Sequence, residues 1–214
     1  MEKSNPLKES LGNFLRNLWD LMILNWLWLL CCLPVLTIGP ATCAMLAVTL
    51  KLARGEATHA AKDFFCSFRD NFKPALLLGL LATAMLVVAC GDIYFALQQT
   101  NIFRSMYLVI GILVAAVFLT VFSYVFALQA MFENPLKVQL QNAFKLAFVA
   151  PGKTITMWLI WMSPILALVV LPPVAVGMLG FLYIIVGASC PAYLCSRILR
   201  NIFDLVNGSP VIPE

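Results

Sequence analysis

Three long runs without a charged residue constrain this chain more than any other feature of its sequence. They cover residues 21–50, 105–132 and 154–196. An apolar run of about 18 or more residues is long enough for one helix to cross a bilayer, whose hydrocarbon core is about 30 Å thick. Charged residues make up 11% of the chain, against about 25% in soluble domains. The sequence therefore predicts an all-α, polytopic membrane protein that forms a single domain over residues 1–214.

The first run is too long for one crossing and too short for two full ones. Its 30 residues would make a helix of about 45 Å, whereas two crossings need about 40 residues. Lys and Arg lie on both flanks, and short loops rich in these residues stay in the cytoplasm. Both ends therefore belong on one side, which predicts a hairpin of helices over residues 13–36 and 40–52. We expect Gly39 to supply the turn and Pro40 to open the second helix.

A cleaved signal peptide is the alternative interpretation of the N-terminal segment, with its basic residues as the charged region. The apolar stretch is longer than such a segment, and it contains Asn25 and Pro34. Further apolar runs also follow it. We therefore expect the segment to be part of the membrane domain.

The distribution of positive charge predicts the remaining topology. Four further helices are expected over residues 74–97, 105–132, 154–171 and 174–195. Thirteen of the 14 Lys and Arg residues then lie in flanks on one side, and only Arg104 lies on the other. Because basic loops stay inside, this predicts about six membrane helices in three hairpins. The protein would be a multi-pass protein of the cell membrane with both termini in the cytoplasm.

Two of the expected cytoplasmic loops have apolar residues at helical spacing. In residues 62–73 these are Phe64, Phe65, Phe68 and Phe72, and in residues 134–148 they are Leu136, Leu140, Phe144 and Phe148. Lys and Arg occupy the other faces, as in amphipathic helices that lie in a membrane interface. The alternative is that each helix packs on the cytoplasmic surface of the protein itself. We favour the interfacial interpretation for both.

The sequence contains no recognisable catalytic motif. It has no nucleophile elbow, phosphate-binding loop or zinc-protease motif, and its seven cysteines and single histidine lack metal-ligand spacing. Asp20 and Asp92 are the only acids near the membrane runs, and both are expected near the interfaces rather than at the centre. We expect no catalytic, cofactor-binding or metal-binding residue and no nucleic-acid partner, and we predict that the protein is not an enzyme.

The break in the first run is the one candidate motif. It comprises Asn25, Pro34, Thr37, Gly39 and Pro40. An unpaired amide in lipid costs several kcal/mol, so Asn25 should face the bundle. We interpret the motif as a structural hairpin first. The alternative is a ligand site at the N-terminus of the second helix, as broken helices provide in transporters.

The N-terminal half resembles a known family. The stretch "LNWLWLLCCLPVLTIGPATCAM", then "LARGE", "DFF" and "FRDNFK", is similar to the YesL-like family of bacterial membrane proteins, a domain of unknown function. The residues that carry the resemblance are Asn25, Trp28, Pro34, Thr37, Gly39, Pro40, Arg54, Gly55, Asp63, Phe64, Phe68 and Phe72. The resemblance implies an integral membrane protein of about this length, often associated with genes for carbohydrate uptake. It implies no activity, substrate or catalytic residue.

Two functions are therefore expected. The first is a non-enzymatic accessory or regulatory component of a membrane complex, with the permease of a carbohydrate ABC importer or another membrane subunit as its partner. The second is a small transporter or channel that acts on its own. The lipid bilayer is an expected partner in both.

Overall fold

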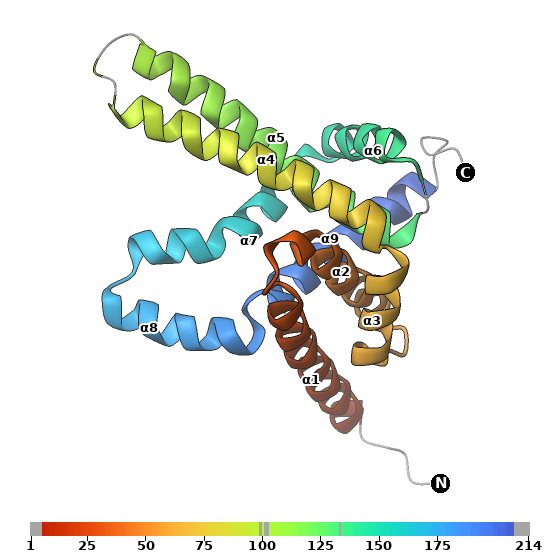
Figure 1. The fold of residues 1–214 in the computed structure, drawn as a ribbon. Coiled ribbons are helices and arrows are strands. Elements are labelled where there is room, and N and C mark those ends of the chain that lie inside the picture. The colour runs from red at the N-terminus through yellow and green to blue at the C-terminus, as the bar shows by residue number, and fades with distance from the viewer. Residues whose placement is uncertain (1–5, 99, 101–102, 133, 208–214) are drawn as a thin grey trace, which may run out of the picture.

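The computed structural model describes residues 6–98, 100, 103–132 and 134–207, and in these ranges it is helical with no strand (Figure 1). The elements in chain order are α1 (Pro6–Cys31), the 3-10 turn η1 (Val35–Thr37), α2 (Ile38–Arg54), α3 (Ala60–Asp70), α4 (Phe72–Gln98), α5 (Phe103–Met131), α6 (Leu136–Val149), α7 (Pro151–Val170), α8 (Pro173–Leu182), the π-turn η2 (Tyr183–Gly187) and α9 (Ser189–Asn207). The all-α prediction is confirmed.

Four helical stretches in the described ranges are long and apolar enough to cross a membrane. They are Val35–Arg54, Phe72–Gln98, Phe103–Met131 and Pro151–Val170. A fifth candidate is a bent pair, Pro173–Gly187 with Ser189–Phe203. The expected number was six. The first predicted helix is not among the candidates, and α1 carries Arg16 and Asp20 within the stretch that leads into its apolar half.

Helix α2 forms the centre of the bundle. Thirteen of its 17 residues are buried, and most of them are small side chains such as Ala, Thr and Cys. It packs against α1, α3, α4, α5 and α9, and Figure 1 shows it enclosed by these elements. Small residues let helix backbones approach closely, which is how helices pack where water supplies no hydrophobic drive.

The first hairpin forms, but its turn differs from the prediction. Helix α1 ends at Cys31 rather than at residue 36, and α2 already begins at Ile38. Gly39 is therefore a buried helical residue and not the turn residue. The hydroxyl of Thr58, just beyond α2, donates to Asp20 Oδ2 in α1 at 3.0 Å. This contact shows that the chain does return to the start of the hairpin.

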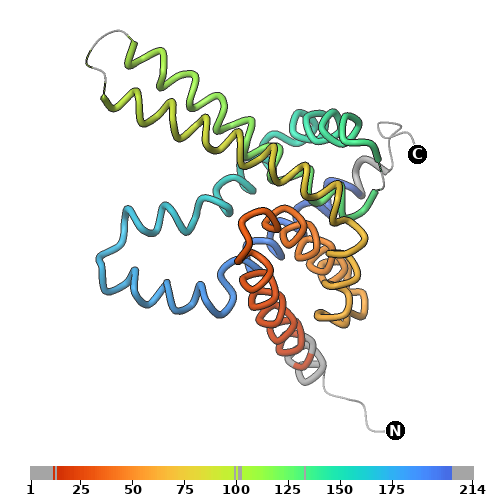
Figure 2. Tube along the Cα trace, viewed as in Figure 1, coloured from red at the N-terminus to blue at the C-terminus, as the bar shows by residue number. Residues whose placement is uncertain are grey.

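Two helical hairpins project from this centre, as Figures 1 and 2 show. The predictions for residues 74–97, 105–132 and 154–171 agree with α4, α5 and α7 within a few residues. The free halves of both hairpins expose apolar side chains, including Val87, Leu113 and Val169. Exposed apolar surface on a long helix is the pattern expected against lipid.

The prediction of one continuous helix over residues 174–195 is wrong. This segment consists of α8, the π-turn η2 and the first part of α9, and the axis bends by 58° at the break. Helix α9 then continues to Asn207 and buries Ala192, Cys195 and Leu199 against the bundle. A π-turn adds one residue to a helical turn, so the residues beyond it point in new directions.

The two amphipathic segments form helices but bury different kinds of face. In α3, Phe64 is fully buried and Phe68 half-buried against the core. The alternative of packing on the protein's own surface therefore describes α3. In α6, by contrast, Phe144 and Phe148 are exposed.

Candidate functional site: the Asn25 junction

Asn25 lies where α1 meets the π-turn, and it is completely buried. Its Nδ2 donates to the carbonyl oxygens of Tyr183 at 3.2 Å and Ile184 at 2.8 Å. Its Oδ1 accepts from the backbone N–H of Ala188 at 2.9 Å and of Ser189 at 3.3 Å. One side chain thus bonds both the carbonyls before the break and the N–H groups after it. The expectation that Asn25 faces the bundle is confirmed.

These four hydrogen bonds have a clear physical role. A π-turn disturbs the regular pairing of backbone groups, and an unpaired backbone group in an apolar interior costs several kcal/mol. An amide side chain has donors and an acceptor on one planar group, so it can serve carbonyl and N–H groups at once. Within η2, the ring of Tyr183 packs directly on Gly187, where a Cβ would overlap it.

The rest of the candidate motif makes contacts inside the protein. Thr37 Oγ1 donates to the carbonyls of Cys31 and Pro34, the latter at 2.7 Å, and so closes the end of α1. A Cβ on Gly39 would overlap the carbonyl oxygen of Ala75 and lie 2.9 Å from Gly79 Cα. Gly39 therefore permits a close crossing of α2 and α4.

The two prolines of the motif have different surroundings. Pro34 is exposed at the tip before η1. Pro40 is buried in the first turn of α2, where a missing N–H is no loss because the first N–H groups of a helix lack partners within it. The structure brings Gly39 and Pro40 to the α2–α4 crossing and leaves Asn25 at the separate π-turn.

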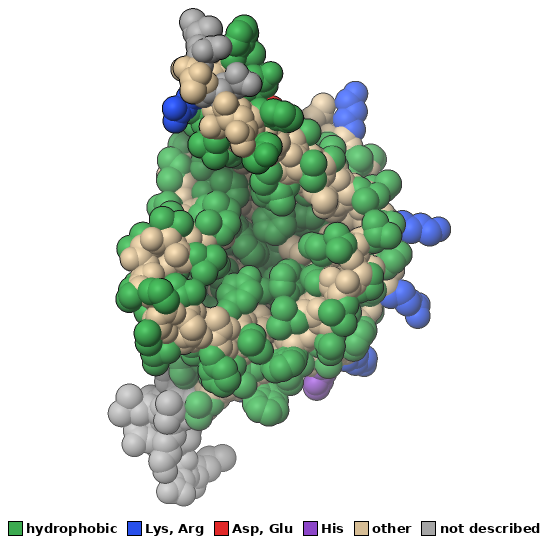
Figure 3. Space-filling model, turned by 60° about the vertical axis from the view of Figure 1, so that its left-hand side comes forward, with side chains coloured by type: hydrophobic (Ala, Val, Ile, Leu, Met, Phe, Trp, Pro, Cys, Tyr) green, Lys and Arg blue, Asp and Glu red, His purple; other side chains and the backbone are tan. Residues whose placement is uncertain are grey.

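An apolar cleft of about 640 Å³ opens beside the junction, between α7, α8, η2 and α9. Its walls include Pro164, Leu168, Leu179 and Val186. Ser163 also lines it, but the hydroxyl of that residue already donates to the carbonyl of Ile160 at 2.8 Å. Figure 3 looks onto an apolar face of the molecule that is hollowed at its centre, with most of the visible Lys and Arg side chains along one edge. The cleft offers an apolar occupant far more than a polar one.

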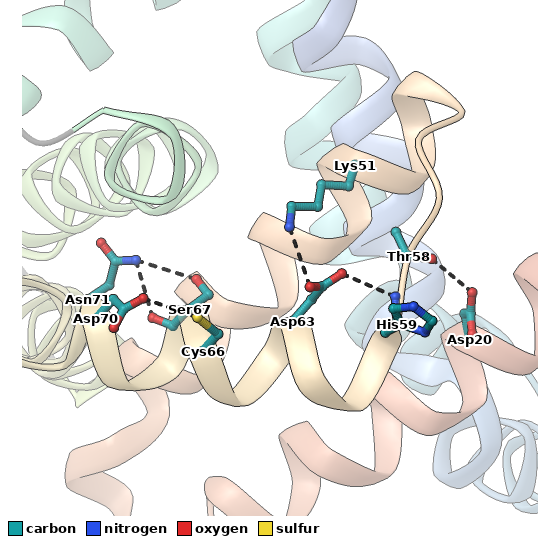
Figure 4. Close-up of polar contacts among 9 residues, drawn as sticks. All are labelled: Asp20, Lys51, Thr58, His59, Asp63, Cys66, Ser67, Asp70 and Asn71. Carbon is teal, nitrogen blue, oxygen red and sulfur yellow. Dashed lines mark hydrogen bonds and ion pairs between the residues drawn. The ribbon is translucent and has the colours of Figure 1, made fainter.

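A second set of polar contacts surrounds α3 (Figure 4). Asp63 accepts from the backbone N–H of His59 at 3.2 Å and forms an ion pair with Lys51 at 3.6 Å. At the other end of α3, Asn71 accepts from Gln129 Nε2 at 2.9 Å. These bonds tie α3 to α2 and α5.

The same helix carries an exposed thiol. Cys66 Sγ donates to Asp70 Oδ2 at 3.3 Å. The hydrogen bond and the negative charge of Asp70 raise the pKa of the Cys66 thiol, because both favour its neutral form. Within the described ranges no three His, Cys, Asp or Glu residues could hold one metal ion.

Sequence reasoning missed several buried polar pairs. The hydroxyls of Thr49 and Ser196 are 2.8 Å apart between α2 and α9, and those of Tyr124 and Thr154 are 2.7 Å apart between α5 and α7. Arg200 Nη1 donates to the carbonyl of Ala53 at 2.7 Å. Single hydroxyls in apolar runs gave no signal of their partners.

Two comparisons with known proteins give a match. Residues 21–93, which contain the whole candidate motif, match the family described as a protein of unknown function, DUF624. The chain is 26% identical over 162 residues to the uncharacterized protein YesL of Bacillus subtilis (strain 168), an alignment that covers 72% of this chain and 74% of that protein. No solved structure matches the chain. The family match and the long alignment together confirm that this chain resembles the YesL-like family.

Proposed function

We propose that this chain is a non-enzymatic accessory or regulatory component of a membrane complex. The observation that carries the proposal is the apolar cleft beside the π-turn. A sugar site or an ion path needs converging hydrogen-bond groups, and of the described residues that line this cleft only Ser163 and Tyr183 carry a hydroxyl group. An apolar helix of another membrane subunit is a suitable occupant.

The packing of α8 supports the same proposal. Among the described elements its one extensive neighbour is η2. Val174, Met178 and Phe181 on α8 are each at least two-thirds exposed. These three residues do not line the cleft, so α8 offers a second protein an additional apolar face next to it.

The partner we propose is the permease of a carbohydrate ABC importer. This part rests on the resemblance to the YesL-like family and on what that resemblance implies about neighbouring genes. The cleft adds only the chemistry of the contact, which is apolar.

We also propose the finer topology of six crossings in the cell membrane with both termini in the cytoplasm. The bias of thirteen basic residues to one supports it, as does the return of the chain at Asp20 and Thr58. Reporter fusions after Arg54 and after Thr100 should give opposite readouts. The same readout from both fusions would rule out this topology.

Site-specific photo-crosslinking in native membranes tests the accessory role. A crosslinking residue at Leu168, in the cleft, should give a product with a second membrane subunit. Leu113 on α5 is a matched control, because the two leucines are 62% and 61% exposed. A single partner captured from position 168 and not from 113 supports the proposal. Lipid adducts alone from both positions would refute it.

The alternative is a small transporter or channel, and the bent α8–η2–α9 segment favours it. Transporters place their sites at discontinuous helices near the middle of the membrane, and the break here is held by a buried amide. Reconstituted protein that moves a sugar or an ion across vesicles without any partner would favour this alternative.

A further inference from the structure

Helix α6 buries two amide side chains and exposes its two phenylalanines. The buried residues are Gln139, Asn142, Ala143 and Leu146, which lie at i, i+3, i+4 and i+7. This face packs against the end of α5 and the start of α7. A helix in water would bury the face with the larger apolar side chains.

The outward side of α6 holds an apolar stripe formed by Leu136, Phe144 and Phe148, together with the half-buried Leu140. Leu136 is 39% exposed, Phe144 37% and Phe148 82%. Other described residues cover Leu136, Leu140 and Phe144 in part, and Phe148 is the side chain of the stripe that they leave most exposed. A surface of this kind needs an apolar phase or an apolar partner next to it.

Two lysines flank the stripe along one side. Lys137 follows Leu136, and Lys145 follows Phe144 about two helical turns further on. Both lysines are exposed. Neither lysine forms an ion pair with a described residue. An apolar stripe bordered by lysines is the arrangement of helices that lie in a membrane interface, with aromatic rings at the acyl boundary and ammonium groups at the phosphates.

Most of the charge near α6 in the sequence is positive. From residue 134 to residue 203 the sequence contains five Lys and Arg residues and no Asp or Glu, and the acids that bound this stretch are Glu133 and Asp204. Lys153, at the start of α7, adds a third positive charge close in sequence to α6. A positive face beside exposed aromatic rings complements an anionic lipid surface.

We propose that α6 is a binding site for anionic phospholipid headgroups. Phe144 and Phe148 insert at the acyl boundary, and Lys137 and Lys145 bind the phosphate groups of the lipids beside them. This site is separate from the cleft between α7 and α9, and it does not depend on the partner proposed for that cleft.

Helix α3 shows why the proposal concerns α6 alone. The exposed side of α3 holds Lys62 and Arg69 but also Asp70, and Arg69 lies 4.0 Å from Asp70. Of its aromatic residues, Phe64 is buried and Phe68 half-buried, while Phe65 is 52% exposed. The opposite charges on its exposed side leave α3 with less preference for anionic lipid than α6.

Photo-crosslinking of the full chain in vesicles tests the proposal. The vesicles contain equal amounts of phosphatidylglycerol, which is anionic, and phosphatidylcholine, which is zwitterionic. A crosslinking residue replaces Phe148 in one sample and Val87, 65% exposed on α4, in the control. We expect phosphatidylglycerol adducts to exceed phosphatidylcholine adducts at position 148, and the two to be equal at position 87.

The Lys137→Gln/Lys145→Gln double variant should remove the preference at position 148. The loss should reach up to about 30-fold, the factor that corresponds to about 1 kcal/mol for each lysine near an anionic surface. The matched Lys62→Gln/Arg69→Gln variant on α3 should keep the preference. Both pairs are exposed, so neither variant should disturb folding.

Three outcomes would overturn the proposal. The first is an adduct ratio at position 148 equal to that at position 87. The second is a preference that persists in the Lys137→Gln/Lys145→Gln variant. The third comes from the same crosslinker in native membranes: adducts at position 148 with a protein rather than with lipid would make the stripe a protein-docking surface.

Discussion

Removing the Asn25 side chain should destabilise the protein by far more than removing an ordinary polar group. Asn25 makes four hydrogen bonds to the backbone on both sides of the π-turn. Interhelical hydrogen bonds in membrane proteins contribute about 0.6 kcal/mol each on average and up to about 1.7. Four average bonds amount to about 2.4 kcal/mol. The backbone groups left without a partner raise the expected loss to about 3–5 kcal/mol.

Two substitutions separate the hydrogen bonds from the packing. Asn25→Ala removes the amide and leaves a small void, whereas Asn25→Leu removes the amide and overfills the site. A similar loss in both variants would therefore come from the hydrogen bonds. The control is Thr156→Val, which removes a single exposed bond from Thr156 Oγ1 to the Gly152 carbonyl and should cost no more than about 0.5 kcal/mol.

The free energy of unfolding in mixed micelles, titrated with dodecyl sulfate, measures the loss. Proteolysis of the folded protein gives a second readout, since the bonds of Asn25 hold residues 183–189. We expect faster cleavage in this segment for both variants. Unfolding free energies within about 0.5 kcal/mol of the wild type for both variants would refute the reasoning.

Three further predictions concern single contacts. Gly39→Ala should reduce the yield of folded protein, because its Cβ would overlap the backbone of α4, whereas Gly177→Ala, which has open space around it, should leave the yield unchanged; equal yields would contradict the close crossing. Thr37→Val should lower the unfolding free energy by about 1 kcal/mol and leave function in a growth assay on the relevant sugar intact; lost function at a normal protein level would favour the ligand-site alternative. Asp70→Asn should lower the pKa of Cys66, so that site-resolved alkylation of this thiol at mildly alkaline pH becomes faster; an unchanged rate would mean that the hydrogen bond is absent.

The long uncharged runs predicted α5 and α7, and the apolar stretch between Lys73 and Asp92 predicted α4. Each is apolar around its whole circumference, so its limits coincide with the charged or Pro-containing flanks. The hairpin of α1 and α2 was predictable for a different reason, which is the basic residues on both flanks. These features depend on neighbours in sequence alone.

Features that depend on distant neighbours could not be predicted in this way. The pair Gly39-Pro40 is equally typical of a turn and of a helix start, and only the crossing with Gly79 explains why residue 39 has no side chain. The burial of Asn25 followed from its polarity. Its partners, about 160 residues away in η2 and α9, had no signal, because backbone groups are the same in every sequence.

The amphipathic segments show how a membrane changes the meaning of a hydrophobic pattern. Both α3 and α6 have aromatic residues at helical spacing, yet Phe64 faces the protein and Phe148 faces away from it. In water, burial of the apolar face would decide both cases, but lipid can cover an apolar face as well as a protein can. The contacts of the two helices then differ. In α3, Phe64 is buried in the core, and Asp63 adds a partly exposed ion pair with Lys51 of α2, which contributes little by itself. In α6 there is no acid to make such a bond, and its buried face combines two amides with Ala143 and Leu146, which leaves the rings and lysines for the bilayer.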